Sequence, residues 1–401
     1  MIILGNGADL NCGLKSSFVD FFSDYKVHYK NEFRDGCQSI TDLKNRILSL
    51  FESGRLTGRV DYEELEKIDL SANYGDIENF WTYWLYLQKG TGEILWSDVE
   101  SQIKEILVKH FAKLQRDGDL ALQSNSRFLT ACKSLLPDRS ALQALCIAKI
   151  RSENMSSLSL YDLLIKDLKD FEIAFSNYLK QEAGSSKSYS VDMQRLIQHL
   201  VGGSKYTVLN FNYTNVTQTL KADSTESLLP IAEQHVHGEV ANCNVIIGVD
   251  SLDIDSKDTN MLLFTKTYRS LFLSQQKYLY PEIILQPSIK RIVFFGHSLS
   301  GNDYSYFQAI FDHFDIYNSE TIITFVYSVF QPYSADELAE EQYMRVIKLL
   351  QRYGETLDNE SHGKNLLAKL LLEGRLMILP LSSLDIDKNT RAHKWAGTEA
   401  F

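Results

Sequence analysis

Three stretches of the chain place small or polar residues directly after a short apolar run. Residues 1–9 read MIILGNGAD, residues 206–214 read YTVLNFNYT, and residues 291–303 read RIVFFGHSLSGND. Such a run is typical of a buried strand, and the loops at the carboxyl ends of strands are where open α/β sheets hold ligands. We therefore expect these three strand ends to meet at one site.

The first loop is rich in glycine and opens a predicted helix. Glycines there would let the backbone approach a phosphate at the helix N-terminus. The spacing is G-x-G-x5-G and not the G-x-G-x-x-G of dinucleotide-binding dehydrogenases, which disfavours that class. The alternative is a glycine turn in which Asp9 or Asn11 caps the helix. The candidate cofactor-binding residues of this loop are Gly5, Asn6, Gly7, Asp9 and Gly13.

The second stretch carries two asparagines, Asn210 and Asn212, separated by one residue. Their side chains therefore point to one face at the end of the predicted strand. Two amides in that position could hold a ribose hydroxyl or orient a water molecule. Ordinary turn formation is the other common use of asparagine at a strand end.

His235 and His237 lie on the same side of another predicted strand, and Gly238 follows them. A zinc site would need a third and a fourth ligand, and although Asp250 is available, nothing fixes its position, so we predict no metal. His237 suits a general base or a contact to a ribose hydroxyl. A structural histidine is the alternative.

The third loop offers backbone N–H groups and hydroxyls to a diphosphate, with Gly296, Ser298 and Asp303 as candidate cofactor-binding residues. It is not the G-x-S-x-G turn of a serine hydrolase, because Ser300 stands two residues after Ser298.

The composition limits the partners. The chain has 401 residues, 44% of them hydrophobic, which predicts a globular protein of two to three domains. Its formal charge of -11 argues against a broad nucleic-acid surface and makes a small neutral or anionic ligand the easier expectation.

The cysteines and the first residues bear on the compartment. The five cysteines are odd in number and lack a C-x-x-C pair, which fits a reducing cytoplasm. No basic leader precedes the apolar residues 2–4, and no apolar run approaches the length of a membrane span. We expect a cytoplasmic protein without a membrane partner.

Periodicity predicts the elements that position these loops. A strand at 1–5 precedes a helix with phenylalanines at 18, 21 and 22, and residues 38–202 show helical patterns with no convincing strand. Short β-rich runs then alternate with helical patterns, which predicts a mostly parallel sheet. The predicted later strands are 207–211, 234–240, 245–249, 291–295, 321–327 and 376–379. The predicted domains are an α/β domain of residues 1–37 and 203–401 and a helical insertion domain of residues 38–202.

Taken in this order, the loops resemble the bacteriophage abortive infection AbiH family. The resemblance rests on residues 5–21, 211–214, 237–238 and 295–303, and Trp96–Glu100 and Glu172 are similar to that family's W-s-D-x-E and a later glutamate. Ala8 stands where the family usually has an aromatic residue.

The same loops are more distantly similar to the sirtuin-like NAD fold. Asn212 matches its asparagine and His237 its catalytic histidine, whereas Lys15 replaces a proline and Thr214 an aspartate. The resemblance implies a Rossmann-like (sirtuin-like) α/β fold with a mostly parallel sheet and a large all-α insertion after the first strand–helix unit. The chain cannot build the four-cysteine zinc module of sirtuin deacylases, so the resemblance implies the branch that hydrolyses NAD.

We therefore expect an antiphage abortive-infection effector, an NAD glycohydrolase with Asn212 and His237 as catalytic residues. The expected partners are NAD, a phage trigger protein and further copies of the chain. One alternative is a sensing module that binds NAD or ADP-ribose and signals without catalysis. Another is a metal-dependent nuclease using Asp98, Glu100 and Glu172, which is disfavoured because Asp98 and Glu100 are two apart, do not share a helix face, and suit solvated surface or capping better.

Overall fold

The computed structural model of the chain describes most of its residues. The described ranges are 1–28, 30–57, 77–88, 96–111, 114, 122–153, 155, 159–221, 228–254, 259–274, 284–330 and 332–384.

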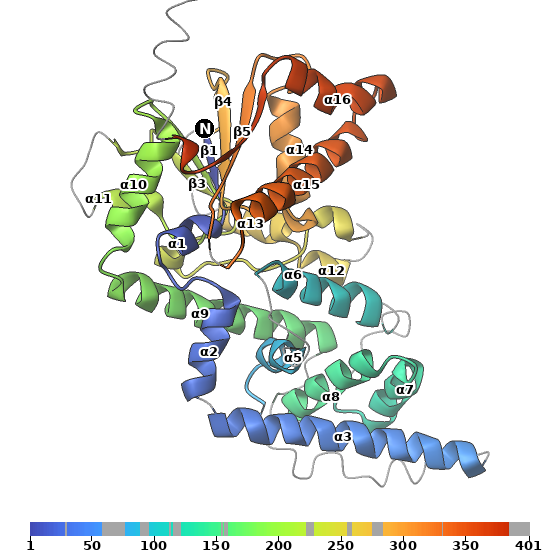
Figure 1. Ribbon diagram of the computed structural model, residues 1–401. Coiled ribbons are helices and arrows are strands. Elements are labelled where there is room, and N and C mark those ends of the chain that lie inside the picture. Colours follow the sequence, from blue (N-terminus) through green and yellow to red (C-terminus); the bar gives the residue numbers. More distant parts are fainter. Residues whose placement is uncertain are drawn as a thin grey trace, which may run out of the picture. The chain divides into compact units, whose positions relative to one another are not determined.

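Six strands form one sheet in the order β3-β2-β1-β4-β5-β6, and every neighbouring pair is parallel (Figure 1). The strands are β1 (Ile2–Leu4), β2 (Val208–Asn210), β3 (Glu233–His235), β4 (Arg291–Phe295), β5 (Ile322–Tyr327) and β6 (Leu376–Pro380). This is the order of doubly wound α/β folds, in which ligands bind outside the carboxyl ends of the strands where the order reverses, here between β1 and β4. The predicted α/β class and parallel sheet are confirmed.

Helices cover both faces of the sheet. The helices are α1 (Gly7–Asn11), α10 (Tyr189–Val201), α11 (Val216–Lys221), α14 (Tyr304–His313), α15 (Ala335–Gly354) and α16 (Glu360–Leu372). In Figure 1, α14, α15 and α16 lie on one side and α10 and α11 on the other. Ile3 packs into the first layer and Ile2 into the second, because successive side chains of a strand point to opposite faces. Burial on both faces explains why the strands read as unbroken apolar runs.

The predicted strand at 245–249 is wrong. Its residues are buried, but only Val249 forms a ladder bridge, to Thr265. Side chains satisfy the backbone instead: the Ile247 N–H donates to the Glu172 carboxylate (2.7 Å), and Arg269 donates to the Ile247 carbonyl (3.1 Å). An apolar run reports burial, and an extended buried segment shares that pattern with a strand.

By packing, the chain separates into two compact units. The sheet unit is residues 1–16, 176–245 and 270–401, and the helical unit is residues 17–175 and 246–269. These boundaries differ from those of the predicted domains at both ends of the insertion. This division assigns residues 17–37 to the helical unit, and α10, which carries Met193 and Ile197 into the core on one face of the sheet, belongs to the sheet unit.

The helical unit is built from helices that pack around buried apolar side chains. They are α2 (Phe18–His28), α3 (Lys30–Thr57), α5 (Phe80–Gln88), α6 (Trp96–Lys104), a π-helix (Glu105–Phe111), α7 (Asn125–Leu135), α8 (Arg139–Glu153), α9 (Leu160–Ser185), α12 (Thr259–Leu262) and α13 (Lys266–Ser274), of which α9 and α13 continue into the sheet unit. The predicted stripe of α2 is confirmed, since Phe18 and Phe21 pack on Phe175 with ring centroids 4.5 and 5.4 Å away. Among the described residues, none of the helices is long and apolar enough to cross a lipid bilayer.

Candidate functional site

Four strand ends lie in one row across the sheet. The register pairs Leu4 with Asn210 and with Phe295, and pairs Asn210 with His235. Because all four strands are parallel, the loops that follow them leave at the same edge. The prediction that the three loops meet is confirmed, and the loop after β3, which carries His237, joins them.

Glycines let the loops after β1 and β4 pack backbone against backbone. The Gly7 N–H donates to the Gly296 carbonyl (2.8 Å). A Cβ on Gly5 would lie 2.5 Å from Cα of His297, one on Gly7 2.6 Å from Cα of Gly296, and one on Gly296, whose φ is 72°, 2.4 Å from N of Ala8. These three glycines are therefore required by the loop-to-loop contact itself. Gly13 (φ 75°) has open space around it and reverses the chain after α1.

Asp9 lies inside α1, where it is buried, and does not cap a helix. Its carboxylate accepts hydrogen bonds from the Tyr189 hydroxyl of α10 (2.7 Å) and from the Thr214 hydroxyl of the second loop (2.8 Å). Burial raises the pKa of Asp9 to about 6, although these two hydrogen bonds act in the opposite direction. Asp9 thus joins the first loop to the second loop and to α10.

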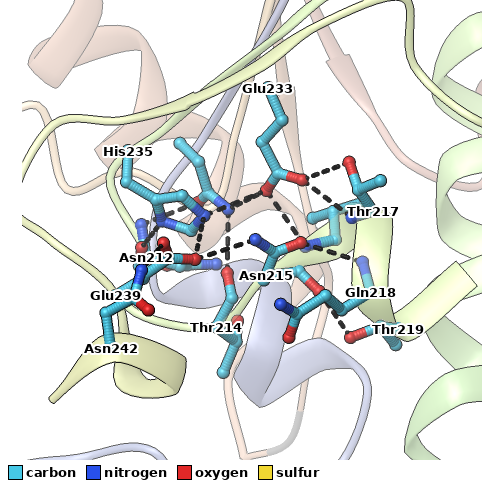
Figure 2. Close-up of polar contacts among 12 residues, drawn as sticks. Asn212, Thr214, Asn215, Thr217, Gln218, Thr219, Glu233, His235, Glu239 and Asn242 are labelled. Carbon is cyan, nitrogen blue, oxygen red and sulfur yellow. Dashed lines mark hydrogen bonds and ion pairs between the residues drawn. The ribbon is translucent and has the colours of Figure 1, made fainter. Parts of the chain in front are cut away.

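Asn210 is fully engaged in holding the second loop. Its Oδ1 accepts the Asn212 N–H (2.8 Å), and its Nδ2 donates to the Thr214 carbonyl (2.9 Å) and to the Glu233 carboxylate (2.7 Å). Glu233 also accepts two backbone N–H groups and the Thr217 hydroxyl (2.6 Å) at the start of α11 (Figure 2). Glu233 was not among the predicted site residues, because one charged residue in a short strand is typical of a solvent-facing position.

The Asn212 side chain, unlike that of Asn210, makes no hydrogen bond within the described part of the chain. Its side chain is 1% exposed, and neither Nδ2 nor Oδ1 has a hydrogen-bond partner among the described residues. Its backbone is held on both sides, by the Asn210 side chain and by His235, whose Nδ1 lies 3.1 Å from the Asn212 carbonyl (Figure 2). Burying a polar group without a partner costs about 1–3 kcal/mol, so Asn212 is a candidate for binding a ligand.

Asn6, in the first loop, repeats this feature in part. Its Oδ1 accepts the Ser16 hydroxyl (2.7 Å), whereas its buried Nδ2 has no hydrogen-bond partner within the described part of the chain. The loops after β1 and β2 thus each present an unpaired amide group.

His237 and Asp303 form a buried pair. Nε2 of His237 lies 2.8 Å from Oδ1 of Asp303, and Nε2 of His297 lies 3.2 Å from Oδ2 of the same carboxylate. The Phe211 ring meets both imidazoles edge to face, with centroids 5.4 and 4.8 Å away. His297 was not among the predicted site residues, although it stands between two that were, Gly296 and Ser298. The Ser298 hydroxyl accepts the Ser300 N–H at 3.4 Å and so belongs to the turn of this loop.

The two glutamates of the nuclease hypothesis form buried ion pairs in the helical unit. Glu100 of α6 lies 2.7 Å from Nζ of Lys266, and Glu172 of α9 binds the Arg269 guanidinium through both oxygens. Glu100 is therefore not solvated surface. The Asp98 side chain lies outside the described residues, within which no group of three or more His, Cys, Asp or Glu is placed to hold a metal ion.

Comparisons with known proteins identify the family. The model described as Bacteriophage abortive infection AbiH matches residues 1–327, which include the four loops and both buried glutamates. No curated protein and no solved structure matches the chain. Because the match covers 327 of 401 residues, the chain belongs to the bacteriophage abortive infection AbiH family.

Proposed function

We propose that this protein acts in abortive infection by hydrolysing NAD to nicotinamide and ADP-ribose at the carboxyl edge of its sheet. The observation that carries the proposal is the Asn212 side chain, which is buried, stands on a backbone held by hydrogen bonds on both sides, and has no hydrogen-bond partner among the described residues. Asn212 lies in the loop after β2, and His237 lies in the loop after β3, the strand that pairs with β2.

The strand order of the sheet is one reason to propose a dinucleotide as the ligand. Doubly wound sheets of this strand order bind dinucleotides across the point where the order reverses, which here lies between the loops after β1 and β4. The distant similarity of the four loops to the sirtuin-like NAD fold supports the same ligand. In this proposal, Asn6 and Ser298 contact the ligand from those two loops.

The reaction needs little covalent chemistry from the protein. Water adds its oxygen to C1′ of the nicotinamide ribose, the bond from C1′ to the pyridine nitrogen breaks, nicotinamide leaves as a neutral molecule, and one proton is released. The transition state is a cation-like sugar, so placing the water and stabilising charge matter more than a strong nucleophile. Asn212 orients the water or a ribose hydroxyl through its free amide, and His237 accepts the proton.

The test measures nicotinamide release by the purified full-length chain, alone and with lysate from phage-infected cells. We expect Asn212→Ala and His237→Ala each to lower turnover about a hundredfold or more, and the exposed His313→Ala to leave it unchanged. Full turnover in both site variants would remove these roles.

The same unpaired amide would also serve a sensing module that binds NAD or ADP-ribose and signals to a partner. Calorimetry separates the two functions. Nucleotide binding that Asn212→Ala abolishes, together with no product from the triggered wild-type protein, would favour sensing over hydrolysis.

A further inference from the structure

The loop after β4 carries a carboxylate held between two imidazoles. We infer that Asp303 and His297 are positioning residues for His237: Asp303 keeps the proton of the neutral imidazole on Nε2 and leaves Nδ1 as its basic nitrogen. The effect of these two residues on turnover rests on the proposed function, whereas the protonation of the His237 ring is independent of it.

The backbone beside His297 determines which nitrogen of its ring carries the proton. Its Nδ1 accepts a hydrogen bond from the Leu299 N–H at 2.9 Å. A ring nitrogen that accepts a hydrogen bond carries no proton, so the proton of the neutral ring is on Nε2. That protonated nitrogen lies 3.2 Å from Oδ2 of Asp303, within the distance of an ion pair.

The local backbone is shaped to make this contact. Leu299 has a φ of 56°, in the left-handed region that a branched side chain rarely adopts, and it is buried. Such a conformation persists where the surroundings fix it, and it is commonest at functional sites. Here it turns the Leu299 N–H toward the ring of His297, two residues earlier.

The protonation of His237 then follows from Asp303. An ionised carboxylate only accepts hydrogen bonds, and Oδ1 of Asp303 lies 2.8 Å from Nε2 of His237. Nε2 is therefore the protonated nitrogen, and the lone pair that can take a proton is on Nδ1. Both side chains are buried, which strengthens a charge-assisted hydrogen bond.

This arrangement serves a base that becomes a cation. When Nδ1 of His237 takes a proton from water, the imidazolium formed is already hydrogen-bonded to the Asp303 carboxylate. A neighbouring carboxylate of this kind fixes the tautomer of the histidine and stabilises its charged form. His297 places a second imidazole nitrogen beside the Asp303 carboxylate, and the Phe211 ring packs against both imidazoles.

The decisive measurement is two-bond proton–nitrogen correlation NMR of the full-length chain with ¹⁵N-labelled histidine. The chain has nine histidines, and His237→Gln and His297→Gln assign the two signals. We expect both rings in the Nε2–H form in the wild-type protein. Asp303→Asn is expected to shift His237 toward the other tautomer, and the exposed Asp336→Asn to change neither ring.

A wild-type His237 in the Nδ1–H form would overturn the inference, as would an unchanged His237 signal in folded Asp303→Asn. Circular dichroism checks the fold of each variant. Should Asp303→Asn fail to fold, the wild-type tautomer of His237 decides by itself.

Turnover of NAD gives the second readout. We expect Asp303→Asn to lower kcat about a hundredfold or more with KM little changed, and His297→Gln, which retains an N–H donor, to lower it less. Asp303→Asn with wild-type kcat would contradict the positioning role. A wild-type protein that releases no nicotinamide would reject the proposed function and leave the tautomer result standing.

Discussion

Asp9 is a buried acid whose ionisation acts against the fold. Its pKa is raised from 3.8 to about 6, chiefly by burial. Between those two values the folded state holds this proton more tightly than the unfolded state, so the contribution of Asp9 to stability is greatest below pH 4 and is lost as the pH rises to 6. The difference between the two pKa values corresponds to about 3 kcal/mol.

We therefore expect the stability difference between the wild-type protein and Asp9→Asn to depend on pH. Raising the pH from 4 to 7 should lower the free energy of unfolding of the wild type, relative to this variant, by about 2–3 kcal/mol. Asparagine removes the charge, so lost contacts to Tyr189 and Thr214 add only a constant offset. Urea unfolding of both proteins across this range is the measurement, and parallel pH curves would refute the raised pKa.

At the residue scale, the sequence locates the side chains that follow strands but not the bonds they make. Asn212 and His237 could be singled out because strand ends gather at one edge of a parallel sheet. The partner of Asp9 could not, since Tyr189 lies 180 residues away. The same pattern also cannot separate Asn210, which is fully bonded, from Asn212, which is not.

At the scale of elements, residues 246–269 are held within the helical unit by charge pairs. Arg269 and Glu172 are both nearly buried, and Glu172 also accepts the Ile247 N–H. Burial raises the pKa of Glu172, while Arg269 draws it down. Removing one partner of such a pair leaves a buried charge without compensation, which costs about 3–5 kcal/mol.

Glu172→Gln should therefore destabilise the helical unit by about that amount, whereas Glu172→Leu combined with Arg269→Met should recover much of the loss. The exposed pair of α16 is the control, and Glu360→Gln should leave stability unchanged. Urea unfolding gives the free energies, and proteolysis of residues 246–269 reports local release. If Glu172→Gln unfolded like the wild-type protein, the pair would have no part in holding this segment.

The sequence predicts helices and strands best where a stretch has a single clear hydrophobic pattern. β4 and β5 are five and six residues long and buried on both faces, so their apolar runs are clear. β3 stops at His235, earlier than predicted, and Gly238 nearby has a φ of 76° and lies so close to Asn244 that a Cβ would meet its carbonyl oxygen at 1.9 Å. That contact joins residues that are not neighbours in the sequence, so the local pattern does not predict where β3 ends. The five residues of α1 are too few for a helical period to emerge.

At the scale of the whole molecule, chain order and spatial order differ. β1 lies between β2 and β4, whose sequences begin more than 200 residues later. The change from helical patterns back to β-rich runs after residue 202 predicted this return to the sheet. The boundaries of the compact units could not be predicted, because the one at residue 175 falls inside α9, whose helical pattern continues from the helical unit into the sheet unit.

The abortive-infection role predicts a result in living cells. Cells that express the wild-type chain should lose NAD after phage infection and accumulate nicotinamide and ADP-ribose before phage are released, because hydrolysis of a shared cofactor halts the metabolism that phage replication needs. Asn212→Ala should keep NAD at the uninfected level and restore phage yield, and Asn365→Ala, an exposed asparagine of α16, should behave as the wild type. Nucleotide levels are measured by mass spectrometry alongside phage titre. Protection from phage at constant NAD would separate the two halves of the proposal: the defence role would stand, the hydrolytic one would fall, and Asn212 would remain as part of a nucleotide sensor only if its substitution also removed protection.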